Sequence, residues 1–108
     1  MESSMVSSNN LLIKDFFQKE FPTFSVLSES AYSMFWEIFL SNNEIEVKVS
    51  GDAGGFSISV FIEKTEFPLW QYNRKVNDFA KTKDENILSQ LIILGKLIKE
   101  LNNESPKL

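Results

Sequence analysis

Two runs of alternating apolar and polar residues meet at an Asn-Asn pair, and this arrangement limits the fold more than any other feature of the sequence. Alternation of this kind is typical of strands that expose one face, because successive side chains of a strand point to opposite faces. Asparagine tolerates positive φ, so a two-residue Asn42-Asn43 loop suits a tight hairpin turn. We therefore predict a β-hairpin in which these residues face each other: Trp36 and Val49, Ile38 and Val47, Leu40 and Ile45, and, on the opposite face, Glu37 and Lys48.

The alternation continues from Phe56 to Ile62, beyond a glycine-rich stretch at Gly51 to Gly55. A loop at residues 52–55 places Val49 opposite Ile58 and Val47 opposite Val60, which keeps one face apolar. The glycines could also suggest a phosphate-binding loop, but no Lys-Ser/Thr pair follows them and no helix begins there. The sequence thus predicts an antiparallel meander with one apolar face and one mixed face.

Helical periodicity marks both ends of the chain. Apolar residues recur at helical spacing from Leu11 to Phe21, with Asn9 or Asn10 as the cap and Pro22 as the stop. Near the C-terminus, Thr82 and Glu85 have capping-box spacing, and a wide apolar seam follows them. We expect this seam to be buried in the core, with a coiled-coil contact as the alternative. Its residues are Ile87, Leu88, Leu91, Ile92, Leu94, Leu97, Ile98 and Leu101.

The remaining segments complete the prediction. We expect a short strand at residues 23–27, a polar turn at residues 28–30 and a second helix that starts at Pro68, with a strand near Trp70 as the alternative. The fold class is α+β: an antiparallel β-meander of about four strands, with an N-terminal helix and C-terminal helices packed on one face. The chain reads as a single domain, 1–108, in which residues 1–9 and 103–108 form frayed tails.

The composition argues against catalysis. The chain has no His and no Cys, which removes the commonest general base, thiolate nucleophiles and the usual zinc ligands. The acidic pairs Glu44 with Glu46 and Asp84 with Glu85 could hold a metal, but a strand end and a helix N-terminus favour solvated roles for them. We therefore expect no enzyme activity and no catalytic, cofactor-binding or metal-binding residues.

The charge balance favours a basic partner. With 15 acidic and 11 basic residues, the net charge of −4 repels phosphate backbones, and the basic residues between Arg74 and Lys83 form only a short stretch. We expect no direct nucleic-acid binding. No apolar run is long enough to span a bilayer and no export signal is evident, so we expect a soluble protein in the cytoplasm.

The mixed face of the meander is the candidate binding surface. The predicted register sets Phe39 and Phe61 beside Glu46, with Glu37 and Glu63 on the flanks. Exposed aromatic residues anchor protein partners, and carboxylates select basic ones. The alternative is that the first or second helix covers this face and makes it a second core layer.

A short acidic chain without His or Cys, laid out as helix, meander and C-terminal helices, resembles the immunity proteins of bacterial contact-dependent growth inhibition and related polymorphic toxin systems. The resemblance covers nearly the whole chain, in layout and composition only, and transfers no functional residue. It implies a cytoplasmic antidote that binds one cognate toxin domain, often a basic nuclease, as a monomer in a 1:1 complex. Type III secretion chaperones, which are acidic homodimers that bind an effector segment, are the alternative, although they insert a helix between strands.

Overall fold

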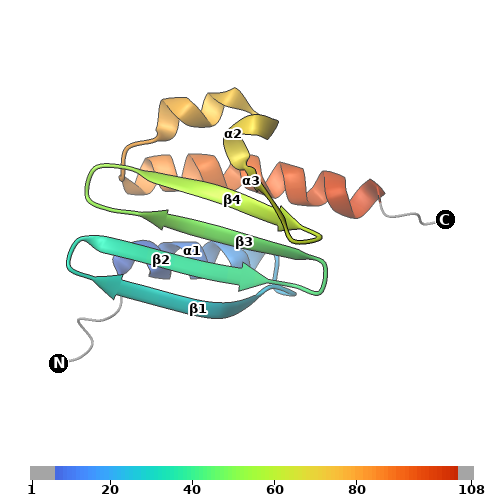
Figure 1. Cartoon of the computed structure of the whole chain (residues 1–108), viewed down its shortest axis with the longest axis horizontal. Helices are drawn as coiled ribbons and strands as arrows, with labels where there is room; N and C mark the ends of the chain where they lie inside the picture. Colours follow the sequence, from blue (N-terminus) through green and yellow to red (C-terminus); the bar gives the residue numbers. More distant parts are fainter. Residues whose placement is uncertain (1–6, 105–108) are drawn as a thin grey trace.

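The computed structural model describes residues 7–104 and confirms an α+β fold. Five antiparallel strands form one sheet in chain order, and the helices pack behind it (Figure 1). Residues 1–6 and 105–108 of the expected tails lie outside the described part, whereas residues 8–9 and 103–104 belong to helices. The elements are α1 (Ser8–Glu20), β1 (Ser25–Tyr32), β2 (Phe35–Ser41), β3 (Ile45–Gly51), β4 (Phe56–Ile62), β5 (Thr65–Pro68), α2 (Leu69–Tyr72), the 3-10 helix η2 (Arg74–Phe79) and α3 (Asp84–Glu104).

One continuous core lies between the sheet and the two long helices. Apolar residues on the inner face of β2, β3 and β4 pack against Ile13 and Phe17 of α1 and against the α3 seam. The fully buried seam residues are Ile87, Leu91, Leu94 and Ile98. Leu88 and Ile92 remain 38% and 55% exposed, so the prediction that they widen the buried seam is wrong. They lie on the side of α3 that turns away from the sheet.

The N-terminal helix is capped and anchored by polar contacts. Ser7, rather than Asn9 or Asn10, is the cap, because its side chain accepts the N–H groups of both asparagines. Asn10 is instead buried, and its amide donates to the main-chain carbonyls of Ser30 in β1 and Glu37 in β2. These bonds fix the first turn of α1 over the gap between β1 and β2.

The β2–β3 hairpin has the predicted faces but not the predicted register. Leu40 faces Val47, Ile38 faces Val49 and Trp36 faces Gly51, because the two-residue loop is Asn43-Glu44 and not Asn42-Asn43. Asn42 starts the turn, and its side chain accepts the N–H groups of Glu44 and Ile45, both at 2.8 Å. A shift of the loop by one residue changes each pairing by two and therefore leaves every side chain on its predicted face.

The β3–β4 hairpin agrees with the prediction. Val49 faces Ile58 and Val47 faces Val60, with residues 52–55 as the loop. Asp52 closes this turn as Asn42 closes the other: its carboxylate accepts the N–H groups of Gly54 and Gly55. Both turns are thus held by the side chain of the first turn residue.

The two outer strands are where the sequence prediction fails most. Residues 28–30, predicted as a turn, belong to the eight-residue strand β1. Ser28 and Ser30 pair with Phe39 and Glu37 of β2, and the turn lies later, at Ser33-Met34. The fifth strand, β5, was not predicted, since its turn has no Gly or Asn. That turn is Glu63-Lys64, with φ values of 52° and 71°.

The second helix starts after Pro68 as predicted, but it is a short α-helix followed by η2. Gln90 of α3 holds η2 in place by donating to the carbonyls of Val76 and Phe79. In the part of the chain that the structure describes, no helix is long and apolar enough to cross a membrane.

Candidate protein-binding face of the sheet

The outer face of the sheet, which we term the open face, is not covered by any of the described helices. Figure 1 shows α1, α2 and α3 behind or beside the sheet, with the strands in front. The alternative that a helix covers this face is therefore wrong. Its side chains in the central strands are Phe35, Glu37, Phe39 and Ser41 of β2, Glu46, Lys48 and Ser50 of β3, and Ser57, Ser59 and Phe61 of β4.

Four of the five predicted binding residues line one hollow of the open face. The hollow has a volume of about 470 Å³ and lies at the end of the sheet where the β2–β3 and β4–β5 turns meet. The predicted residues that line it are Phe39, Glu46, Phe61 and Glu63. Glu37, the fifth, lies outside it: it faces Ser50, not Lys48 as predicted, farther along the same face.

The register decides which groups touch within the hollow. Glu46 faces Phe61, as predicted, but Phe39 faces Lys48 and not Glu46. Phe39 and Glu46 are therefore diagonal neighbours on one face, a separation that an aromatic side chain still spans. The two rings are half-buried, and none of the described helices packs over them. Two aromatic rings, the carboxylates of Glu44, Glu46 and Glu63, and Lys64 thus line one hollow.

Ion pairing leaves the open face acidic. Lys48 is 3.6 Å from the carboxylate of Glu66, a residue of β5 that faces Phe61. Among the described residues, no lysine or arginine pairs with Glu37 or Glu46. Two half-buried carboxylates on this face are therefore available to a basic partner.

The turn that closes the hollow is a feature that sequence reasoning missed. Glu63 and Lys64 both have positive φ, which is the signature of a type I′ turn. Type I′ turns favour Asn-Gly, and non-glycine residues in this conformation cost free energy. The only sequence signal was the resumption of strand-forming residues at Thr65 to Phe67.

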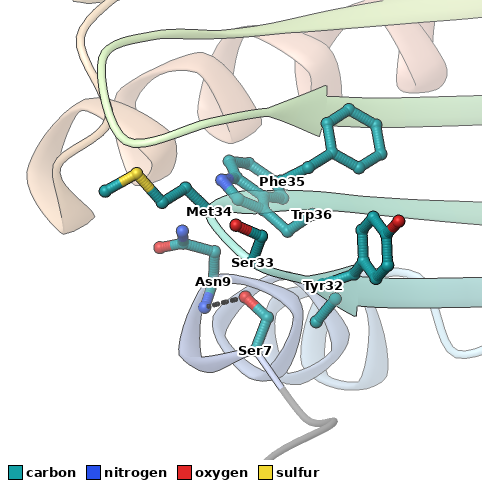
Figure 2. Close-up of a pocket in the computed structure, with 8 residues that line it drawn as sticks. Ser7, Asn9, Tyr32, Ser33, Met34, Phe35 and Trp36 are labelled. Atoms are coloured by element: carbon teal, nitrogen blue, oxygen red, sulfur yellow. Dashed lines mark hydrogen bonds between the residues drawn. The ribbon is translucent and has the colours of Figure 1, made fainter.

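Apolar side chains gather at the opposite end of the open face, at the tip of the β1–β2 hairpin. Tyr32, Met34 and Phe35 are 72%, 67% and 44% exposed. Figure 2 shows Tyr32 and Phe35 on the two strands, Met34 at the turn and the capped start of α1 beneath them, where Ser7 bonds Asn9. The turn residue Ser33 has a φ of 58°. These residues border a hollow of about 230 Å³ that no charged side chain lines.

The side chains of the open face are aromatic rings, carboxylates, serines and a lysine. Between residues 7 and 104, His, Cys, Asp and Glu side chains form no group of three or more that could hold a metal. Aromatic rings, carboxylates and open main-chain turns offer contact area and charge to another protein. Comparisons with protein-family profiles, with curated proteins and with solved structures find no match to this chain.

Proposed function

We propose that this chain is an immunity protein, an antidote that binds a cognate toxin domain through the open face and occludes the active site of that toxin. The observation that supports the proposal is the hollow in which Phe39 and Phe61 flank Glu46, whose carboxylate pairs with no lysine or arginine of the described residues, on a face left uncovered by the described helices. Aromatic anchors dominate binding energy at hot spots, and unpaired carboxylates favour a positively charged partner.

The chemistry of the face defines the partner. A basic domain, such as a nuclease whose active site attracts phosphate, supplies the positive groups that Glu37 and Glu46 lack. The net charge of −4 steers such a domain towards the chain and makes association slower as salt rises. The antidote would act in the cytoplasm, with one toxin domain bound by each chain.

The test of function uses the toxin domain encoded by the neighbouring reading frame. We expect that domain to arrest growth when expressed alone, and co-expression of this chain to restore growth. Growth arrest that this chain does not relieve, together with no complex between the two purified proteins, would refute the proposal.

The test of the surface is a charge reversal with a matched control. Glu46→Lys places a cation in the hollow, whereas Glu20→Lys makes the same change of net charge on an exposed position of α1, behind the sheet. We expect Glu46→Lys to weaken binding at least tenfold more than Glu20→Lys, with both variants folded. Calorimetry at two salt concentrations and thermal unfolding measure the two quantities. Equal affinities for the two variants would place the interface elsewhere.

The aromatic anchor provides an independent check. Phe61→Ala removes a ring that faces Glu46 in the hollow. Truncation of a hot-spot aromatic costs about 2 kcal/mol or more, which is roughly a thirtyfold loss of affinity. A Phe61→Ala variant that folds and binds as tightly as the parent would show that this ring is not an anchor.

A further inference from the structure

Strand β1 is an edge of the sheet, and no other described strand pairs with its outer side. It is the first strand in the order β1–β5 and the longest, with eight residues, of which all but Ala31 are exposed. Natural edge strands are usually blocked by charged side chains, above all Lys, by Pro or by a bulge, and the one charge of β1, on Glu29, is paired with Lys14 of the same chain. Residues 25–32 contain no Lys, Arg or Pro, and the bulge at Leu27 interrupts only the start of the strand. The regular segment from Ser28 to Tyr32, which we term the edge segment, is therefore open to pairing.

The hydrogen bonds of α1 show which main-chain groups of the edge segment are free. The amide of Asn10 donates to the carbonyls of Ser30 and Glu37, at 3.3 and 3.4 Å, so both carbonyls lie in the gap between β1 and β2. Ser30 and Glu37 face each other, which makes them a hydrogen-bonded pair. Because the pattern alternates along an antiparallel edge, Glu29 and Ala31 direct their N–H and C=O groups away from the sheet.

We infer that β1 pairs with β1 of a second copy of this chain, antiparallel and with the two-fold axis at Ser30. In this register Glu29 exchanges both main-chain hydrogen bonds with Ala31 of the second copy, and Ser28 lies opposite Tyr32 of that copy. The two Ser30 side chains meet at the axis on the open face, where they are small enough not to clash.

Charge selects this register over its neighbour. Glu29 is the only charged residue of β1, and a two-fold axis at Glu29 would set two carboxylates directly opposite each other. With the axis at Ser30, each Glu29 instead faces the methyl group of Ala31. The carboxylate of Glu29 also stays bonded within its own chain, 2.7 Å from Lys14 and 3.5 Å from the amide of Asn10.

The helical layer permits the pairing. Asn10 lies over the gap between β1 and β2, and the corresponding gap of the second copy would be two strand spacings away, about 10 Å. Helices pack at roughly this distance, so the first turns of the two α1 helices would lie side by side without a clash.

The resulting dimer has a continuous sheet of five strands from each copy, with both open faces on one side. The hollow at Glu46 stays free, so this inference does not depend on the proposed function, and it departs from the monomer expected from sequence.

Single cysteines test the register, because the chain has none of its own. Ser30→Cys sets two thiols opposite each other at the axis, within the reach of a disulfide. Ser28→Cys, the matched control on the same face, leaves its thiols about 13 Å apart, four residues along the strand. Under mild oxidation we expect a covalent dimer from Ser30→Cys at a rate at least tenfold that of Ser28→Cys. Equal rates would overturn the proposed pairing.

Sedimentation velocity over a concentration series tests the association itself. We expect the unmodified chain to shift from monomer to dimer as its concentration rises. Ser30→Lys, which brings two ammonium groups together at the axis, should raise the dimer dissociation constant about tenfold or more, and added salt should recover part of that loss. Ser57→Lys adds the same charge at an exposed position of β4 on the open face and should dimerise like the parent. A chain that stays monomeric throughout, or dimers equally insensitive to both lysines, would overturn the inference.

Discussion

The β4–β5 turn holds two non-glycine residues in the left-handed region, and relief of that strain should stabilise the protein. Glu63 and Lys64 have φ values of 52° and 71°, where the Cβ atom crowds the backbone. This conformation costs an L-residue other than Gly, Asn or Asp about 1–2 kcal/mol. Glycine at position 64 removes the cost but loosens the unfolded chain by about 0.5–1 kcal/mol. We expect Lys64→Gly to gain about 0.5–1 kcal/mol, and Glu63→Asn with Lys64→Gly to gain about 1–2 kcal/mol.

The assay is urea unfolding followed by tryptophan fluorescence, since Trp36 is 3% exposed in the folded chain. A gain of 1 kcal/mol corresponds to a rise of about 4 °C in Tm for a chain of this length. Glu44→Gly is the matched control, because Glu44 is also the second residue of a two-residue loop but none of the positive-φ residues lies in that turn. It should destabilise by about 0.5–1 kcal/mol. The reasoning fails if Lys64→Gly is no more stable than the parent, or if Glu44→Gly stabilises equally.

Three further predictions concern the core and two titrating groups. Leu91→Ala should destabilise by about 2–5 kcal/mol in chemical unfolding, because Leu91 is fully buried, whereas Ile92→Ala, at a position 55% exposed, should cost less than about 1 kcal/mol. The hydrogen bond from the Tyr72 hydroxyl to Glu100 raises the pKa of Tyr72, so Glu100→Gln should lower that pKa in an ultraviolet titration of tyrosinate. Because the folded pKa is the higher one, the bond stabilises the fold below the ordinary tyrosine pKa, and this contribution is lost as pH rises through the folded value. The N–H groups of Gly54 and Gly55 lower the pKa of Asp52. The stability that these hydrogen bonds contribute is therefore present above the ordinary aspartate pKa and is lost as pH falls through the folded value. The unfolding midpoint of Asp52→Asn should accordingly depend less on pH in that acidic range than the midpoint of the parent.

The sequence alone determines which face of the sheet each central residue occupies. The alternation in β2, β3 and β4 puts Phe39, Glu46 and Phe61 on one face in both the predicted and the observed register, because a one-residue shift of a two-residue hairpin loop changes the pairing by two. The buried half of the α3 seam could also be predicted from the sequence, because its four residues, at 4-3-4 spacing, lie on the same side of the helix: Ile87, Leu91, Leu94 and Ile98. The fold class and the grouping of most predicted binding residues were therefore predictable.

Local patterns could not supply the features that depend on competing contacts. Asn42 serves as a side-chain acceptor at the start of its turn, and the choice between that role and a positive-φ loop residue is made by the hydrogen bonds of the whole hairpin. Ser28 and Ser30 have weak strand propensity, yet they lie in β1 because β2 and the buried amide of Asn10 give their backbone partners.

Whether the open face is covered was also decided only by the tertiary structure. The mixed composition of that face is compatible with a buried second layer or with an exposed surface, and the sequence of each strand is the same in both cases. The outcome follows from the helices: the buried faces of α1 and α3 are both satisfied by the single apolar face of the sheet and by each other. Alternation is a property of each strand by itself. Whether a helix covers a face of the sheet depends instead on how all the apolar faces of the chain pack against one another.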